Sequence, residues 1–497
     1  MFKNFPGYKL LESLQKKKSH KRERKFPLNA IKLIFIIAVT SVIALLPTES
    51  FGIEGLTAIH QRIIALFVFA ALMWLTETMP SWVTSMIVVT VMLFTVSTSS
   101  LSFLRPEDAV GLVPFKSIFA CFSNPTIMLF IGGFVLAIGL TKVKLDVALA
   151  RVLLKPFGTR SEIVLLGFIL VTAIFSAFVS NTATAAMMLA FLTPVLKSLP
   201  ADGKGRIALA LAIPVGANLG GMITPIGTPP NMIALDYLSS QGMGISFVDW
   251  TIKMAPFVIV LLVISWILLR VLFPFKQKNI KIEIEGEINW NYKTWSVVVA
   301  FALTIFMWMF GTDLWNVDTN VVAMIPIAIF CATGILTRRD LEEINWSVLW
   351  MVAGGFALGV ALNYSDANSA SLSSLIVKSV PFDNFSPLVV MILAGLICFG
   401  FSNFISHSAA TSLLVPVLGV VAGGLGEALN GFGGPQAMLV GIAIASSVSM
   451  ILPISTPPNA IAHSTGFIQQ KDMMKVGIII GLMGLALGYG MLIFIGF

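Results

Sequence analysis

The chain has 497 residues, of which 57% are hydrophobic and 11% are charged, and its mean hydropathy is +0.92. A soluble protein cannot bury that much apolar surface, so the composition excludes soluble enzymes and soluble binding modules. The net charge of +8 lies almost entirely in residues 1–25, where nine Lys and Arg residues accompany two Glu residues. A basic run beside a first apolar segment is typical of a positive-inside membrane anchor. We therefore interpret residues 1–28 as a basic cytoplasmic tail and expect no nucleic-acid partner.

Apolar segments long enough to cross a lipid bilayer recur along the whole chain. Two further apolar blocks, 161–200 and 385–420, are interrupted near their centres. The pattern predicts an all-α integral membrane protein with about 11 transmembrane helices. These helices are expected near residues 29–47, 60–78, 82–98, 126–141, 206–240, 251–273, 294–311, 320–336, 346–364, 437–468 and 474–496.

Charges on the connecting segments indicate an orientation. With the tail inside, the connections after the fourth and eighth spans are also inside, and both are rich in Lys and Arg. The segments 311–319 and 365–384, on the opposite side, carry mainly Asp. This distribution predicts a cell-membrane protein with a cytoplasmic N-terminus and an outer C-terminus. A hydrophilic linker at 274–293 separates a first half, 29–273, from a second half, 294–497.

The two halves contain a repeated series of landmarks. Gly133, in Phe130-Ile-Gly-Gly-Phe, matches Gly355 in Val352-Ala-Gly-Gly-Phe. Further on, Ser180-Asn181 matches Ser402-Asn403 at the same offset of 222, and Pro225-Ile-Gly-Thr-Pro-Pro-Asn231 matches Pro453-Ile-Ser-Thr-Pro-Pro-Asn459 at an offset of 228. Because an odd number of spans separates the copies, the second is upside down in the membrane. This is the inverted-repeat plan of secondary transporters.

Each interrupted block is predicted to be a re-entrant hairpin. In block 161–200, apolar residues precede and follow the polar tip Ser180-Asn181-Thr182. Block 385–420 has the same form around Ser402-Asn403. If these blocks crossed the membrane, the alternation of the basic loops would fail.

A second kind of interruption follows each hairpin, at Thr228-Pro229-Pro230 and at Thr456-Pro457-Pro458. Two successive prolines remove two amide donors and disfavour helical geometry in the preceding residue. Upstream carbonyl groups then lack helical partners. Unpaired carbonyls are costly inside a membrane, so we expect another group, such as a cation, to bind them. The segments 206–240 and 437–468 are therefore predicted to be broken helices.

The hairpin tips and the broken helices together predict a binding site for an anion. Half-helix N-termini present free N–H groups and a positive dipole end, which suit a carboxylate. A lone Ser-Asn usually joins helices and a lone Pro-Pro usually makes a kink, but two copies of both in matching order favour a site. His407 is better explained as a packing residue, with a functional role as the alternative.

The Ser-Asn-Thr tip and the Thr-Pro-Pro-Asn loop resemble the divalent anion:sodium symporter family, which includes di- and tricarboxylate transporters and exchangers. The resemblance extends from Trp74–Pro80 to the loop at Thr456. It implies a homodimer with a static scaffold and a transport domain that moves like an elevator. That domain would hold both hairpins and both broken helices.

The resemblance also implies the roles of individual residues. One substrate carboxylate would contact Ser180, Asn181 and Thr182, with Thr228 and Pro229 nearby. The other would contact Ser402, Asn403, Thr456 and Pro457. The first sodium site of the family corresponds to Ser176, Ser180, Asn181 and the carbonyl of Gly227. The resemblance implies sodium as a coupling ion, and we expect no cofactor besides it.

The second repeat departs from the family pattern. Phe404 stands where a third tip hydroxyl is expected, and Cys398, a poor sodium ligand, stands four residues before Ser402. His407 lies in this hairpin where the first repeat has Ala185. One hypothesis is therefore a sodium-independent exchanger in which His407 supplies part of the missing charge. Phe404 would narrow the pocket and favour a slim dicarboxylate over citrate.

These observations predict secondary active transport of C4 and C5 dicarboxylates, the class of succinate, malate, fumarate and 2-oxoglutarate. A sodium-coupled dicarboxylate or citrate symporter and a sulfate or oxyanion transporter remain alternatives. A channel would not need two asymmetric hairpins. The sequence contains no Walker A motif, His-Glu-x-x-His or Gly-x-Ser-x-Gly, so we expect neither an ATP-driven pump nor an enzyme.

Overall fold

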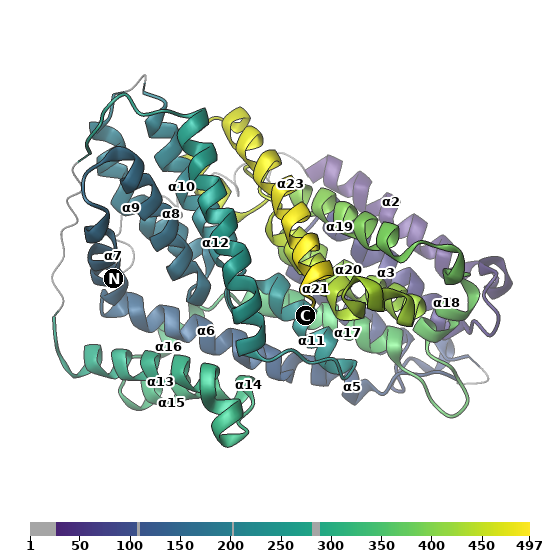
Figure 1. Cartoon of the computed structure of the whole chain (residues 1–497). Coiled ribbons are helices and arrows are strands. Elements are labelled where there is room, and N and C mark those ends of the chain that lie inside the picture. The colour runs from purple at the N-terminus through teal and green to yellow at the C-terminus, as the bar shows by residue number, and fades with distance from the viewer. Residues whose placement is uncertain (1–25, 107–109, 201–202, 281–288) are drawn as a thin grey trace.

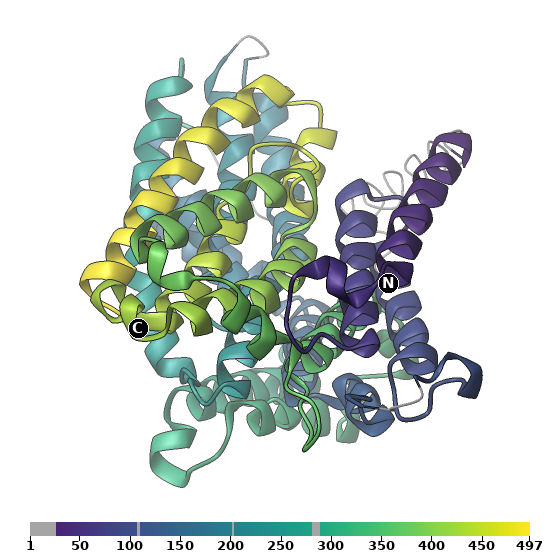
Figure 2. The ribbon, with the colours of Figure 1, turned by 90° about the vertical axis from the view of Figure 1, so that its right-hand side faces the viewer.

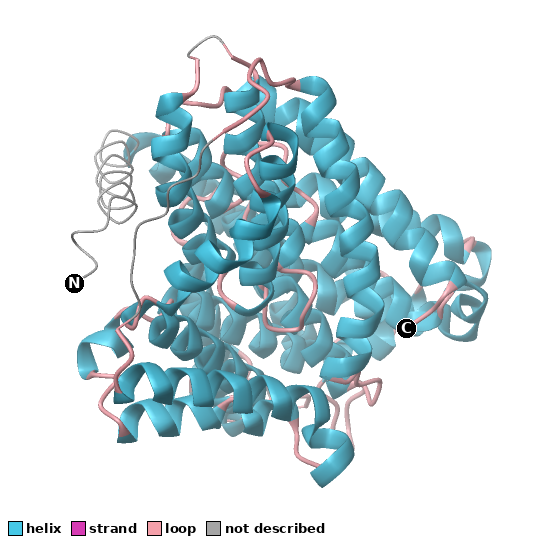
Figure 3. Ribbon diagram, turned by 60° about the vertical axis from the view of Figure 1, so that its left-hand side comes forward, coloured by secondary structure: helices cyan, strands magenta, loops and turns pink. Residues whose placement is uncertain are grey.

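A computed structural model describes residues 26–106, 110–200, 203–280 and 289–497. Within these ranges every named element is a helix, and β-type pairing is limited to three isolated bridges (Figure 3). The all-α prediction is thus confirmed. Most of the basic tail and part of the hydrophilic linker lie outside the described residues.

In the described part of the chain, nine helical segments are long and apolar enough to cross a membrane. The protein is therefore a multi-pass membrane protein. The nine are α3 (Ala58–Thr76), α5 with α6 (Phe115–Lys142), α8 (Ser161–Phe178), α12 (Phe247–Leu272), α13 (Tyr292–Trp315), α17 (Trp346–Asn363), α19 (Pro387–Phe404), α20 with its 3₁₀ extension (His407–Phe432) and α23 (Gln470–Phe494).

The remaining helices complete the bundle between these segments. Several are apolar, and they include α9, the second arm of the first interrupted block. Their bounds are α2 (Phe26–Leu45), α4 (Ser81–Thr95), α7 (Leu145–Leu154), α9 (Asn181–Ser198), α10 (Gly205–Gly220), α11 (Pro229–Ser240), α14 (Thr319–Val322), α15 (Met324–Ala332), α16 (Arg338–Glu342), α18 (Leu372–Ser379), α21 (Gly434–Ser447) and α22 (Pro457–Ser464).

The helices gather in two groups (Figures 1 and 2). In one group α10 packs between α8 and α12, and α21 packs against α19, α20 and α23, which in turn contacts α12. In the other, α17 packs on α3 and α4, and α15 packs on α6 and α13. Figure 2 shows α2 and its neighbours standing apart from the green and yellow helices of the first group. Apolar side chains remain exposed on outer faces, for example Ile252 at 62% and Val271 at 69% on α12, as expected of a surface that contacts lipid.

The four interruptions predicted from the sequence are present as ends of helices. Residues 179–180 separate α8 from α9, and residues 405–406 separate α19 from α20. Longer irregular segments, 221–228 and 448–456, separate α10 from α11 and α21 from α22. The packing is crosswise, because α9 contacts α22 and α20 contacts α11. The second arm of each hairpin therefore contacts the broken helix of the other half as well as that of its own half.

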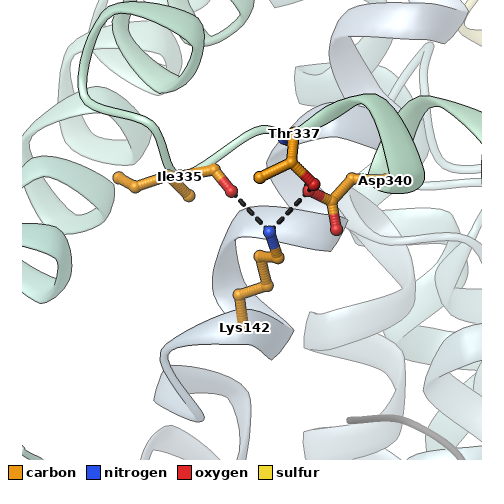
Figure 4. A network of polar contacts seen from close by, with 4 residues as sticks. All are labelled: Lys142, Ile335, Thr337 and Asp340. Atoms are coloured by element: carbon orange, nitrogen blue, oxygen red, sulfur yellow. Dashed lines mark hydrogen bonds and ion pairs between the residues drawn. The ribbon is translucent and has the colours of Figure 1, made fainter.

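An ion pair fixes the end of α6 to the connection before α16 (Figure 4). The Lys142 ammonium donates to the Ile335 carbonyl at 2.6 Å and to Asp340 Oδ2 at 2.5 Å. The same carboxylate oxygen accepts from the Thr337 amide at 2.6 Å, which begins α16 with a capping box. Burial alone would raise the pKa of Asp340, but these donors outweigh it and lower the pKa below its ordinary value.

Candidate functional site

The first hairpin tip is built by a helix cap. Val179 is extended, and Ser180 caps α9 by accepting from the Ala183 amide at 3.3 Å. Asn181 is the first residue of α9, followed by Thr182. A serine N-cap satisfies one amide and leaves the other N–H groups of the first turn available, which is the arrangement expected for an anion site.

Behind this tip, the Asn181 side chain meets oxygen atoms from α8, from α10 and from the irregular segment after α10. The amide atom on this side lies 2.6 Å from Ser176 Oγ, 3.1 Å from the Gly227 carbonyl and 3.3 Å from the Ala217 carbonyl. Ser176 itself donates to the Ala217 carbonyl at 2.7 Å. If this amide atom is nitrogen, it donates to these groups; if it is oxygen, four oxygen atoms converge, which is the ligand set of a hard cation.

The irregular segment after α10 is tightly packed around the same point. A Cβ atom at Gly221 would lie 2.5 Å from Asn181 Oδ1, and one at Gly227 would lie 2.4 Å from the Gly221 carbonyl oxygen. Asn231 Nδ2 donates to the carbonyls of Gly221 at 3.1 Å and Thr224 at 2.9 Å. Thr228 is extended and buried before Pro229, which opens α11. These glycines therefore let the backbone approach the tip closely.

The second tip lies four residues further along the chain than predicted. Ser402 and Asn403 are in the last turn of α19, and Ile405 is the extended residue. Ser406 caps α20 by accepting from the Ala409 amide at 3.3 Å, as Ser180 does in the first hairpin. The counterpart of Ser180-Asn181-Thr182 is therefore Ser406-His407-Ser408.

This register changes two expectations. Ser402, four residues before the capping serine, is the counterpart of Ser176, so Cys398 does not occupy that place. Phe404 ends α19 and is 61% exposed, and it does not replace a tip hydroxyl. The two Ser-Asn dipeptides match by residue identity, but the serines at equivalent positions in the structure are the helix caps Ser180 and Ser406.

Protein donors satisfy the break of the second half. His407 Nε2 lies 2.5 Å from the carbonyl oxygen of Ser449, the counterpart of Gly221. Asn459 Nδ2 donates to the carbonyls of Met450 at 2.8 Å and Leu452 at 3.0 Å. Asn403 Oδ1 accepts from the Ile451 amide at 2.9 Å. The two halves thus share a backbone plan but differ chemically, because an imidazole stands where the first half has an amide.

Asn218, which the sequence analysis did not single out, connects the halves. From α10 its Nδ2 donates to Thr456 Oγ1 at 3.3 Å and to Asn459 Oδ1 at 3.1 Å. Thr456 caps α22, which Pro457 opens. Contacts therefore run from the first tip through the first break to the second break and the second tip. A polar residue in the last turn of a glycine-rich membrane helix was the available sequence signal.

A separate cavity of about 360 Å³ lies where α11 faces α17, α20 and the start of α6. Asp236 of α11 lines it and accepts from Thr126 Oγ1 of α6 at 2.8 Å. The bond joins the group of helices that carries the tips and breaks to the group that contains α6.

Comparisons with known proteins agree with this architecture. A family described as citrate transporters matches residues 64–433, about three quarters of the chain. An uncharacterized transporter of Haemophilus influenzae is 30% identical over 470 residues, covering 90% of this chain and 94% of the relative. The sodium-dependent dicarboxylate transporter SdcS of Staphylococcus saprophyticus is 28% identical over 459 residues, covering 85% and 83%.

Two solved transporter structures share the fold. The YdaH transporter of Alcanivorax borkumensis has a TM-score of 0.54 at 13% identity, and the match covers 87% of this chain and 97% of that one. The antimetabolite efflux pump MtrF of Neisseria gonorrhoeae has a TM-score of 0.50 at 13% identity, covering 84% and 95%. At this identity the likeness concerns the fold alone.

Proposed function

The chain belongs to the citrate transporter family, and from that premise we propose that it is a secondary active transporter of C4 and C5 dicarboxylates. Membership in this family makes it a transporter and not an enzyme, and it confirms the family prediction made from the repeated motifs. The observation that carries the substrate proposal is the pair of serine-capped helix N-termini, each beside a broken helix. Each end suits one carboxylate of a short dianion.

In this proposal the first carboxylate contacts Ser180, Asn181 and Thr182, with Thr228 and Pro229 behind them. For the second carboxylate, the register of α19 and α20 favours Ser406, His407 and Ser408. Thr456 and Pro457 complete this half, while Ser402 and Asn403 support the tip from behind. Neutral hydroxyl and amide donors bind a carboxylate without the strong charge pairing that arginine would add.

The proposed architecture is a pair of inverted repeats with about 11 membrane crossings and two re-entrant hairpins. Both hairpins and both broken helices form a transport domain that moves like an elevator against the scaffold, in a homodimer. The basic loops favour a cytoplasmic N-terminus. Matching break positions in the two halves support this proposal. The Asp236–Thr126 hydrogen bond joins the two parts and must break when the domain moves.

A sodium ion in the first half is the proposed coupling ion. With the amide oxygen of Asn181 turned to this side, the oxygens of Ser176, Asn181, Ala217 and Gly227 form a suitable ligand set. Relatives that are named sodium-dependent dicarboxylate transporters support this choice. In the second half, the imidazole of His407 stands where the first half has the Asn181 amide and is bonded to the Ser449 carbonyl, so one sodium site is proposed rather than two.

Sodium-independent exchange is the second candidate mode. It rests on His407, whose imidazole donates a hydrogen bond to the Ser449 carbonyl. In the first half, the equivalent residue is Asn181, whose amide is a proposed sodium ligand. The loss of hydroxyl groups inferred from Cys398 and Phe404 no longer supports it, because neither residue occupies the relevant position.

Liposomes containing the purified protein would test both modes through labelled succinate uptake. We expect uptake into empty liposomes when an inward sodium gradient is imposed. Uptake that requires internal dicarboxylate and ignores sodium would establish the exchange mode instead. Uptake of sulfate or phosphate with no competition from succinate would replace the dicarboxylate proposal with an oxyanion transporter.

A further inference from the structure

A basic cavity lies at one end of the helix group that carries the breaks, away from both hairpin tips. It has a volume of about 590 Å³ and lies between the start of α10, the end of α12 and the connection from α22 to α23. These ends lie together at the top of the molecule in Figure 1. The volume is that of an ordinary ligand pocket.

The described lining of this cavity is strongly positive. It includes four cationic side chains and one carboxylate: Lys204, Arg206, Lys471, Lys475 and Asp472. The Asp472 carboxylate is buried and accepts from the Gln469 amide at 3.2 Å, which completes the capping box of α23. It is therefore engaged in the helix cap, and the remaining charge favours an anion.

Arg206 is the central residue of the cavity. Its guanidinium carbon lies 4.3 Å from the centre of the Phe467 ring, a cation–π contact that fixes the side chain. Its Nε is buried and has no hydrogen-bond partner among the described residues. The side chain as a whole is only half-buried and lines the cavity, so other N–H groups of this held guanidinium can donate to an oxyanion there.

The positive ends of two helix dipoles add to this field. α10 begins at Gly205 and α23 begins at Gln470, and residues beside both starts line the cavity. We propose that the cavity binds a phosphate-bearing anion and thereby ties the start of α10 to the connection between α22 and α23. The proposal concerns a site distinct from the substrate site and does not depend on the substrate.

The surroundings indicate two sources for such a phosphate. Val271 is 69% exposed near the end of α12 and Ile478 is 40% exposed near the start of α23, so lipid-facing surface adjoins the cavity. Basic pockets between membrane helices at this level suit phospholipid headgroups. The same groups would accept free inorganic phosphate or pyrophosphate from solution.

Thermal unfolding of the purified protein in neutral detergent would test the site. Phosphatidylglycerol, cardiolipin and pyrophosphate would be titrated separately against the wild type, the double variant Arg206→Gln/Lys471→Gln, and a control, Arg338→Gln. Arg338 is exposed, and its contact with Glu342 spans 3.9 Å on the short helix α16, far from this cavity in sequence.

We expect at least one phosphate-bearing probe to raise the melting temperature of the wild type and of Arg338→Gln. The double variant should need at least about ten-fold more of that probe for the same rise, because it removes two of the four cationic side chains that line the cavity. A rise with both lipids and pyrophosphate would identify phosphate itself as the ligand, and a rise with lipids alone would identify a headgroup. Equal shifts in all three proteins, or no shift with any probe, would overturn the proposal. Native mass spectrometry on the same samples would show whether a double variant that melts early still binds the probe.

Discussion

Replacing Gly221 by alanine tests the proposed sodium site at a single atom. The residue is the C-cap of α10, with φ −59° and ψ −20°, which alanine adopts without strain, so only the added Cβ matters. That Cβ would lie 2.5 Å from Asn181 Oδ1 and 3.1 Å from the Gly227 carbonyl oxygen. Both atoms belong to the proposed ligand set.

The size of the effect follows from these distances. Ordinary contact begins near 3.4 Å, so the Asn181 side chain must move by about 0.9 Å. A displacement on this scale moves one ligand and crowds another, and losses of this kind cost about 10- to 100-fold in metal affinity. The corresponding loss in sodium binding free energy is about 1.4 to 2.8 kcal/mol.

The assay is the sodium concentration that gives half-maximal succinate uptake in proteoliposomes. We expect Gly221→Ala to raise it by about 10- to 100-fold, with a smaller change in the succinate concentration dependence at saturating sodium. Gly423→Ala is the matched control, because Gly423 lies on exposed α20 surface and an added Cβ meets nothing within 4 Å. An unchanged sodium dependence in a Gly221→Ala protein that melts like the wild type would refute the reasoning, as would wild-type transport that ignores sodium.

Three further changes test other contacts. His407→Asn restores the amide of the first repeat and removes the donor to Ser449, so we expect steeper sodium dependence of uptake; an unchanged Hill coefficient would contradict this. Asp340→Asn weakens the partner of Lys142 and should destabilise the protein by about 2 kcal/mol at pH 7, measured by thermal unfolding. Because the pKa of Asp340 is lowered on folding, its contribution is present above the ordinary Asp pKa and lost below it, so wild type and variant should converge as the pH falls below about 4. Asn218→Ala removes two buried hydrogen bonds between the halves and should cost about 1–3 kcal/mol in stability, and equal melting of variant and wild type would exclude that role.

The broken helices could be predicted because their cause is local. Two successive prolines disfavour a helix interior but suit a helix start, and in the structure each pair opens a new helix, α11 or α22, after α10 and α21 have ended at Gly220 and Ser447. The apolar spans could be predicted for a similar reason, because composition and length decide whether a helix can enter a membrane. Helix ends agree with the expected segments within a few residues in most cases.

The second hairpin tip could not be placed by residue identity. Ser-Asn occurs at both Ser180 and Ser402, but only the first pair stands at the start of a helix. The decisive property is the serine that caps a helix, and Ser406 fulfils it through the Ala409 amide. Repeat offsets of 222 and 228 on either side already implied an insertion between them. The offset of the capping serines, Ser180 and Ser406, falls within that interval.

Contacts between distant segments could not be predicted from the sequence. Neither the bond from Asn218 to Thr456 nor the ion pair of Lys142 with Asp340 has a local signature, because each partner alone suits many roles. Such pairings depend on how helices cross, and one sequence without relatives does not specify that geometry.

The crosswise packing of the two halves has a consequence for how the protein is made. α9 has α22 as a partner, and α11 has α20, so the contact surfaces of the first half are incomplete until residues 407–464 have been synthesised. During that interval the nascent chain holds polar tips and unpaired backbone groups inside the membrane, which is costly. The insertion machinery must therefore shelter the first half through the synthesis of more than 150 residues, from the end of α11 at Ser240 to the start of α20 at His407. Truncated chains that stop before α20 should be substrates for membrane quality control rather than stable half-transporters.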